Sequence, residues 1–184
     1  YCVVTLSWLF FTVFGMLPFY FSGSIDTITN AFFETMSGFT TTGATILDDI
    51  ESLSHGMLFW RSLTQWIGGL GIVFITIAIL PIFTTGGVQL FSAETTGVTH
   101  DRTHPKINVM AKWLWTIYLI LTVSETILLM FGGMDLFDAI CQSFATTATG
   151  GYSTKQNSIS YWNSPYIEYV VAIFMIISSI NFSL

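Results

Sequence analysis

The sequence predicts an all-α integral membrane protein built from tandem helix–pore-loop–helix repeats with re-entrant half-helices. Three observations lead to this fold class. The chain of 184 residues is 52% hydrophobic and 9% charged, whereas a soluble domain carries about 25% charged residues. Short apolar segments that end in Thr-Gly turns lie between long apolar segments. This order occurs twice, and both copies run in the same direction.

Composition also narrows the class of function. The net charge of −6 argues against a nucleic-acid partner. Cys2 and Cys141 lie in apolar segments and suggest no disulfide framework. The sequence offers neither a nucleophile–base pair nor a phosphate-cradling glycine loop, so we expect no enzyme and no cofactor. The chain starts with Tyr1 inside an apolar run, and we expect a fragment of a longer protein.

The first repeat is predicted over residues 1–83 and opens with a spanning helix. Residues 1–21 are nearly all apolar, and about 20 such residues cross the hydrocarbon core as a helix. Pro18 should mark a kink or the outer end. Residues 28–37 then form a short helix that Gly38 ends. This helix rises about 15 Å, so it can enter the bilayer without crossing it.

A second spanning helix is predicted over residues 57–83. Arg61 near its start should snorkel to the interface or pair with an acid. Between the short helix and this span lie Asp48, Asp49 and Glu51. These acids either concentrate cations at an aqueous mouth or belong to an ordinary solvated loop.

Residues 84–106 form the predicted cytoplasmic connection, and residues 107–184 form the second repeat. Three of the five basic residues lie in or just after the connection, namely Arg102, Lys106 and Lys112. The positive-inside rule therefore places the connection in the cytoplasm and both Thr-Gly turns outside.

The second repeat has the same plan as the first. We expect a span over 107–131, a half-helix over 135–145 and a last span that begins at residue 166 after a surface loop. Glu125 inside the first of these spans is expected to bond to a neighbouring pore helix or loop.

The two turns, residues 40–45 and 147–154, are the candidate site. Non-helical backbone at membrane depth is tolerated only where it is buried in protein or lines a water-filled cavity. Carbonyl oxygens there can replace the hydration shell of a monovalent cation. Neither turn has a charged side chain, although a divalent-ion site would favour carboxylates. The expected filter residues are Thr41, Thr42, Gly43, Ala44, Thr149, Gly150, Gly151 and Tyr152.

An internal repeat selects the glycines within these turns. A shift of 108 residues places Gly43 on Gly151 and Thr41 on Thr149. Glycine adopts positive φ without steric cost, so we expect Gly43 and Gly151 to turn the carbonyls toward one axis. Gly150 is the alternative to Gly151 in the second turn.

Three motifs carry a resemblance to a known family. They are Phe-Thr-Thr-Thr-Gly-Ala-Thr at 39–45, Phe-Trp-Arg-Ser-Leu-Thr-Gln-Trp-Ile-Gly-Gly-Leu-Gly at 59–71 and Thr-Gly-Gly-Tyr-Ser-Thr at 149–154. Over its whole length the chain resembles the Trk/Ktr/HKT superfamily of potassium transporters, most closely the bacterial Trk membrane subunits. The resemblance implies a potassium-channel-like fold of four fused repeats. This chain would hold two of them, about half a filter, and would not conduct alone.

The resemblance also implies what the site binds and where the protein works. Glycine rather than serine at Gly43 implies a preference for potassium, with K+ held at Thr42, Gly43, Gly150 and Gly151. The family implies uptake across the cell inner (cytoplasmic) membrane by a multi-pass protein in contact with lipid. It further implies homodimers and a cytosolic nucleotide-binding regulatory subunit.

Two other functions fit parts of the sequence. A sodium-coupled cation symporter could use the Thr-Gly turns as helix breaks around a midplane site. Such transporters often contain inverted repeats, whereas these repeats run the same way. A membrane-embedded assembly subunit without a permeation path is the other alternative. We expect potassium uptake through a carbonyl-lined filter.

Overall fold

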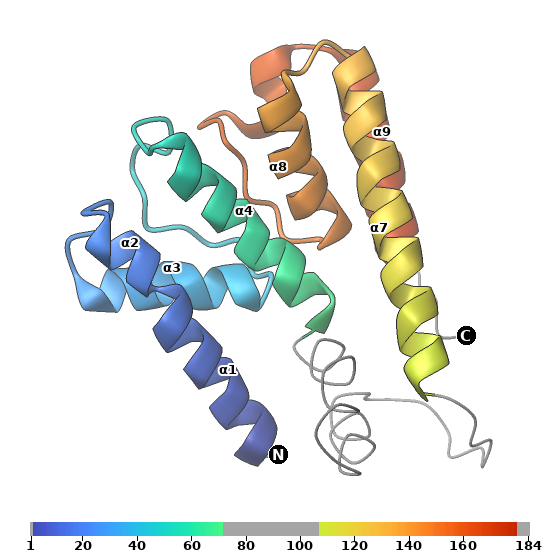
Figure 1. The fold of residues 1–184 in the computed structure, drawn as a ribbon. Coiled ribbons are helices and arrows are strands. Elements are labelled where there is room, and N and C mark those ends of the chain that lie inside the picture. Colours follow the sequence, from blue (N-terminus) through green and yellow to red (C-terminus); the bar gives the residue numbers. More distant parts are fainter. Residues whose placement is uncertain (1, 72–106, 180–184) are drawn as a thin grey trace.

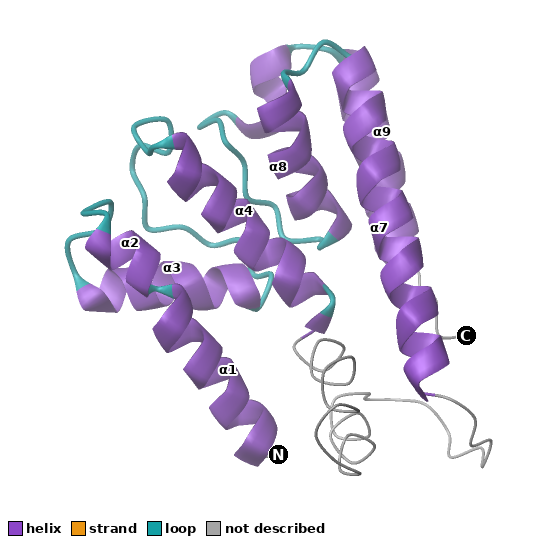
Figure 2. Cartoon of the chain, viewed as in Figure 1, coloured by secondary structure: helices purple, strands orange, loops and turns teal. Residues whose placement is uncertain are grey.

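The computed structural model describes residues 2–71 and 107–179, and this part of the chain is helical with connecting loops (Figures 1 and 2). The remainder of the predicted second span and the predicted cytoplasmic connection lie outside the described residues. The elements are α1 (Cys2–Gly15), α2 (Leu17–Phe21), α3 (Ile28–Phe39), α4 (His55–Gly69), α7 (Ile107–Phe131), α8 (Leu136–Thr147), the 3₁₀ helix η2 (Ser158–Trp162) and α9 (Pro165–Ser179).

The first predicted span is divided rather than continuous. Helix α1 ends at Gly15, and α2 begins at Leu17 with Pro18 in its first turn. Proline has no N–H to continue the helical ladder, but it is tolerated in a first turn. The Trp60 indole of α4 donates to the Gly15 carbonyl oxygen at 2.9 Å, which ties the break to a neighbouring helix.

Helix α3 extends beyond its predicted end. It continues to Phe39, so the expectation that Gly38 ends it is wrong. Gly38 lies inside the last turn because α4 packs there, and a Cβ atom at this position would overlap the Thr64 hydroxyl. The glycine serves close helix packing rather than helix termination.

The described part of the second predicted span differs in length. Helix α4 starts two residues before residue 57 and ends at Gly69, where Leu70 is the C-cap. Gly71 then adopts a φ of +70°. Helical geometry is therefore interrupted inside the predicted range 57–83, within a glycine-rich stretch of low helix propensity.

The second-repeat helices lie close to their predicted positions. Helix α7 covers the predicted range 107–131, and its Trp113–Phe131 segment is the one helix in the described residues that is long and apolar enough to cross a membrane. Helix α8 runs two residues past the predicted end at 145, and the Asp135 carboxylate caps it by accepting from the Phe137 N–H at 3.1 Å. Part of the predicted surface loop forms η2.

Helices α3 and α8 are copies of one another in backbone terms. Each has 12 residues, and their first residues are 28 and 136, which reproduces the 108-residue shift. The bonds after each helix also correspond. The Thr42 N–H donates to the Ser37 carbonyl at 3.0 Å, and the Gly150 N–H donates to the Ala145 carbonyl at 2.8 Å. The same hydrogen-bonded turn therefore connects each helix to the loop that follows it.

Helix α4 connects the two halves of the molecule. It packs against α3 on one side and α8 on the other, while α7 and α9 lie beside α8 (Figure 1). One apolar core joins α7, α8 and α9, and a smaller one joins α2 to α3. The buried members are Leu129, Met134, Ala139, Ile167, Val170, Val171 and Phe174 in the first core, and Phe19, Ile25 and Ala31 in the second.

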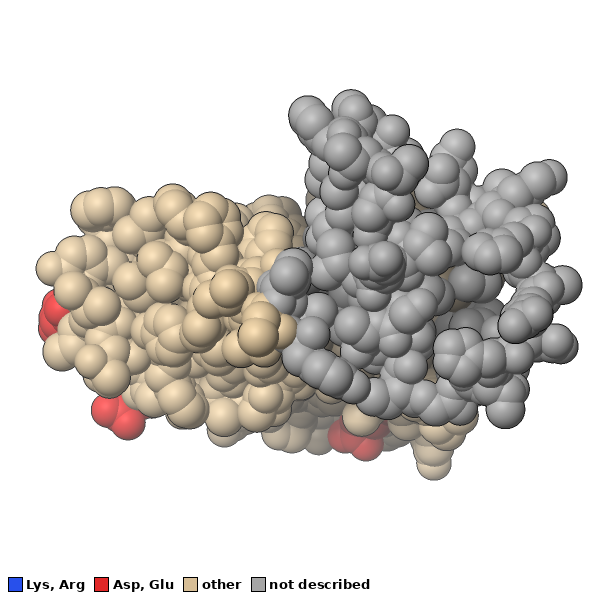
Figure 3. Space-filling view, turned by 90° about the horizontal axis from the view of Figure 1, so that it is seen from below, with Lys and Arg blue, Asp and Glu red and all other residues tan. Residues whose placement is uncertain are grey.

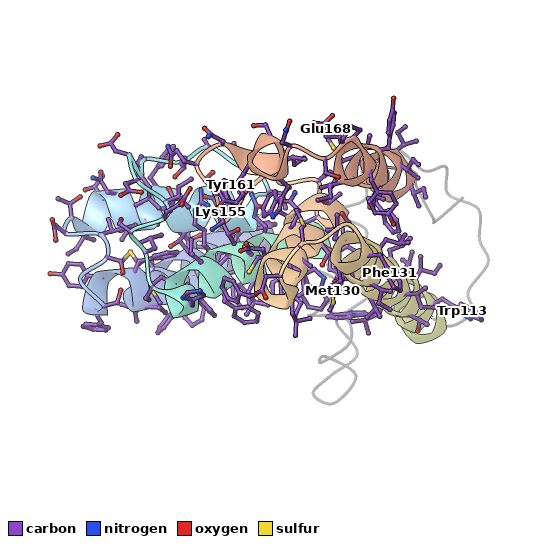
Figure 4. The ribbon with its side chains drawn as sticks, turned by 90° about the horizontal axis from the view of Figure 1, so that it is seen from above. Trp113, Met130, Phe131, Lys155, Tyr161 and Glu168 are labelled. Atoms are coloured by element: carbon purple, nitrogen blue, oxygen red, sulfur yellow. The ribbon has the colours of Figure 1, made fainter. Side chains whose placement is uncertain are left out.

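Large apolar side chains cover much of the outer surface. Phe131 at the end of α7 is 80% exposed, and Ile120 and Val123 on the same helix are also exposed. Figure 4 shows Trp113 and Phe131 at separate points along α7. The described atoms of the face in Figure 3 are uncharged apart from a few acidic patches near its edges. Such a surface suits hydrocarbon or further protein rather than water.

Candidate functional site

The two Thr-Gly loops, which are far apart in sequence, lie against each other. We call residues 40–46 the first loop and residues 148–154 the second loop. A Cβ atom on Gly43 would overlap the carbonyl oxygen of Gly150. The Tyr152 hydroxyl also donates to the Ala44 carbonyl at 3.3 Å. The predicted site residues of the two repeats are therefore brought together at one place.

Both loops have the same alternation of backbone angles. In the first loop φ is +54° at Thr41 and +76° at Gly43. In the second loop φ is +54° at Thr149 and +85° at Gly151. The two glycines thus adopt the expected positive φ, which costs them little. Gly150 has no positive φ, so Gly151 is the conformational counterpart of Gly43.

The threonines were not expected in this conformation. A β-branched residue at positive φ is a genuine outlier, and such strain persists only where the surroundings enforce it. The sequence signal was the alignment of Thr41 with Thr149 under the 108-residue shift. Alternating positive and negative φ turns successive peptide groups, which is what a row of carbonyls directed at one axis requires.

The hydroxyl groups of the first loop hold its backbone. The Thr40 hydroxyl donates to the Met36 carbonyl at 2.7 Å and lies 2.8 Å from the Thr42 hydroxyl. The Ser37 hydroxyl donates to the Ala44 carbonyl at 2.6 Å. Because Tyr152 also donates to this carbonyl, Ala44 directs its oxygen toward the protein.

A buried ion pair lies behind both loops. The Arg61 Nε atom of α4 is 2.7 Å from the Glu34 Oε1 atom of α3, and the two side chains are 2% and 0% exposed. Arg61 therefore pairs with an acid, which was one of the two expected outcomes. Its Nη1 atom donates to the Ser153 carbonyl in the second loop at 3.0 Å. Arg61 thus links the first repeat to the second loop.

Besides pairing with Arg61, the carboxylate oxygens of Glu34 accept hydrogen bonds that fix the first loop. Its carboxylate accepts from the Thr45 hydroxyl at 2.9 Å and from the Ile46 N–H at 3.0 Å. A buried ion pair is tolerated when its leftover lone pairs are satisfied in this way. The single Glu34–Arg61 pair therefore reaches both loops.

Tyr152 joins the second loop to the first repeat at both ends of the residue. Its backbone N–H donates to the Gln65 Oε1 atom at 3.0 Å, and its hydroxyl shares its one proton between the Glu34 carbonyl at 2.9 Å and the Ala44 carbonyl at 3.3 Å. The ring lies 3.6 Å from the Arg61 guanidinium carbon. A phenol is protonated at neutral pH, so the buried hydroxyl donates.

The acidic segment after the first loop also contacts the second repeat. Asp48, Asp49 and Glu51 are exposed. Gln156, after the second loop, donates its N–H to the Glu51 carboxylate at 3.3 Å and accepts from the Ile50 N–H at 3.1 Å. Nearby, Lys155 stands over the Tyr161 ring at 4.8 Å (Figure 4). The acids therefore belong to a loop that closes against the second repeat.

Glu125 of α7 makes the kind of bond that was expected. It is fully buried, and its Oε2 atom accepts from the Thr147 hydroxyl at the end of α8 at 3.4 Å. The carboxyl therefore fixes α8 to α7 just before the second loop.

Comparison with known proteins decides the family. The family model described as "TrkH: Cation transport protein" matches residues 1–184. The chain belongs to the TrkH family of cation transport proteins. It is 50% identical over 186 residues to the "Trk system potassium uptake protein TrkH" of Escherichia coli K12, covering 100% of this chain and 38% of that protein.

More distant members and a solved structure agree with this family. The TrkG protein of Escherichia coli K12, also named a Trk system potassium uptake protein, is 36% identical over the whole chain and 38% of its own length. The crystal structure of the potassium transporter TrkH from Vibrio parahaemolyticus has a TM-score of 0.79 and 38% identity, over 99% of this chain and 36% of that one.

The match also bears on location and length. A TrkH family chain is part of a multi-pass integral protein of the inner membrane. The chain spans about 38% of the length of the relatives it matches.

Proposed function

We propose that this protein takes up potassium ions across the cytoplasmic membrane through a selectivity filter to which the first and second loops contribute main-chain carbonyls. The relatives are named for potassium uptake, and this chain spans about 38% of their length. In the proposal, residues 1–83 and 107–184 are two of four helix–pore-loop–helix repeats, joined by a cytoplasmic connection at 84–106. The remaining filter comes from other parts of the full-length protein.

One observation carries the proposal. Two adjacent loops have positive φ at Thr41 and Gly43 and at Thr149 and Gly151, in the same alternation. Carbonyl oxygens presented by such backbone can replace the water around K+. The ligands proposed are the carbonyls of Thr42, Gly43, Gly150 and Gly151. Thr41 and Thr149 turn the backbone, whereas Ala44 and Tyr152 fasten it to the scaffold.

The electrostatics of the two short helices suit a cation. Each loop follows the C-terminal end of α3 or α8, and the partial negative charge of a helix dipole lies at that end. The loops have no charged side chain of their own. Inward movement of K+ would be driven by the membrane potential, at about 2.3 kcal/mol per charge per 100 mV.

Partners are proposed on family grounds. We expect the full-length protein to form a homodimer in lipid and to bind a cytosolic nucleotide-binding regulatory subunit through the connection at 84–106. Co-purification of that subunit with the wild-type protein, and its loss when the connection is replaced, would support this assembly.

Serine substitution of the filter glycines tests the function. In the full-length protein, Gly43→Ser and Gly151→Ser should each lower potassium-over-sodium selectivity by about tenfold, because a side chain at positive φ displaces the ligand carbonyls. Rubidium uptake and its block by sodium would be measured in cells that lack other potassium uptake.

Gly56→Ser on α4 is the control, because no atom lies within 4 Å of a Cβ atom placed there. Unchanged rubidium uptake and unchanged sodium block in both filter variants would contradict the proposal. Uptake that strictly requires a second ion would instead favour a sodium-coupled symporter.

A further inference from the structure

Gln65 of α4 lies between the two loops without belonging to either. The side chain is 0% exposed. Its Oε1 atom accepts from the Tyr152 N–H of the second loop at 3.0 Å. Because an N–H can bond only to the carbonyl oxygen of an amide, this contact fixes which side of the Gln65 amide is the nitrogen. Gln65 therefore holds the second loop from a helix of the first repeat.

The Nε2 atom of the same amide faces both filter loops. It would lie 2.6 Å from a Cβ atom on Gly150 and 3.7 Å from one on Gly43. Gly150 is therefore a glycine because the Gln65 amide occupies its side-chain space. This Nε2 atom is buried and has no hydrogen-bond partner among the described residues. The amide thus packs against both loops beside their contact, as well as bonding to one of them.

The arrangement has no counterpart in the second repeat. Helices α4 and α9 begin at residues 55 and 165, so the position of Gln65 in α4 corresponds to Met175 in α9. Met175 is apolar and 51% exposed. Among the described residues, a polar side chain packed against neighbouring loops is therefore present at this position in the first repeat and not in the second.

We propose that Gln65 is a positioning residue for ion selectivity: it holds the second loop in its contact with the first loop and so sets the discrimination between potassium and sodium. This inference rests on the filter proposed above. Selectivity depends on the cavity size or on the number and field of the coordinating carbonyls. The amide acts on either property, because it packs against Gly150 beside Gly43 and fixes the peptide between Gly151 and Tyr152.

Two substitutions in the full-length protein distinguish the effect of the hydrogen bond from Tyr152 to Gln65 from the effect of the volume of the Gln65 side chain. Gln65→Met keeps the length of the side chain but removes the acceptor for the Tyr152 N–H. Gln65→Glu keeps an acceptor at the same place. We expect Gln65→Met to lower the potassium-over-sodium selectivity ratio about tenfold, the equivalent of one buried hydrogen bond. We expect Gln65→Glu to stay closer to wild type.

Thr122→Val is the matched control. It removes the bond from the Trp66 indole of α4 to the Thr122 hydroxyl of α7, at 3.1 Å, which joins the repeats away from the loops. This variant should keep the wild-type selectivity ratio even if its thermal stability falls. Rubidium and sodium fluxes would be measured in proteoliposomes at equal protein content.

Each outcome decides the inference. A wild-type ratio in Gln65→Met, or an equal loss of ratio in Thr122→Val, overturns it. If Gln65→Met does not insert, a relaxed ratio in the shorter Gln65→Asn supports the inference and a wild-type ratio overturns it. The filter proposal is judged separately: it survives when Gly43→Ser relaxes selectivity, whatever Gln65 variants do.

Discussion

At the scale of single residues, one ion pair holds the backbone of two loops. Arg61 binds Glu34 on one side and the Ser153 carbonyl on the other, with both ionised groups removed from water. Charges in such a place are stable only as a pair, because desolvation of either one alone is costly. The pair therefore makes the geometry of the loops depend on two side chains that cannot serve as filter ligands.

Removing one member of the Glu34–Arg61 pair should lower the free energy of unfolding more than removing both members. We expect Glu34→Gln to lower the free energy of unfolding by about 3–5 kcal/mol, because the Arg61 charge then stays buried without a counter-charge. The double variant Glu34→Gln with Arg61→Met should recover part of this loss. Thermal unfolding of the purified full-length protein measures both.

Glu51→Gln provides the control, since Glu51 is exposed and surface charge pairs contribute little. A single variant as stable as wild type, or a double variant less stable than the single one, would show that Glu34 and Arg61 are not energetically coupled.

At the scale of elements, α4 is the helix on which the site is assembled. It carries Arg61, Gln65 and Trp66, each of which bonds to the second repeat. It also approaches the end of α3 closely, and a Cβ atom on Gly68 would overlap the Phe39 carbonyl oxygen. Small residues allow backbones to approach in this way within membranes.

Two glycines of α4 should therefore respond differently to the same substitution. Gly68→Ala forces α3 and α4 apart and should destabilise the protein by about 1–3 kcal/mol, the usual result of overpacking. Gly56→Ala lies in open space and should be neutral or slightly stabilising, because alanine favours helix. Thermal unfolding compares the two, and equal melting temperatures would contradict the close contact.

At the scale of the whole molecule, the distribution of basic residues predicts an orientation in the membrane. By the positive-inside rule we expect the connection at 84–106 in the cytoplasm. The acidic segment with Glu51, which Gln156 joins to the second repeat, is then expected on the opposite side. An uptake filter that opens outward beside this segment would receive ions from the external solution.

Cysteine labelling tests this orientation in intact cells. In full-length protein with Cys2 and Cys141 replaced by Ala, Glu51→Cys should react with a membrane-impermeant maleimide added outside. Val98→Cys in the connection should react only after the cells are opened, because residue 98 is expected to face the cytoplasm. Labelling of residue 98 in intact cells would contradict this orientation and indicate the opposite one.

The sequence by itself determined the features that depend on local composition. Low charge and long apolar runs indicate a membrane protein, and the limits of α7 follow from one long, predominantly apolar stretch. The 108-residue repeat placed α3 and α8 in register and selected Gly43 and Gly151 for positive φ. Glycine reveals such positions because its conformational freedom is a property of the residue alone.

Only the tertiary structure decided which side chains hold the loops together. Gly38 lies inside a helix, Arg61 pairs with Glu34, and Tyr152 bonds to residues up to 118 positions away. Nothing in the local sequence specifies such partners, because α4 brings them together only when it packs between α3 and α8. The positive φ of Thr41 and Thr149 has the same origin, since a β-branched residue adopts it only where surrounding contacts impose it.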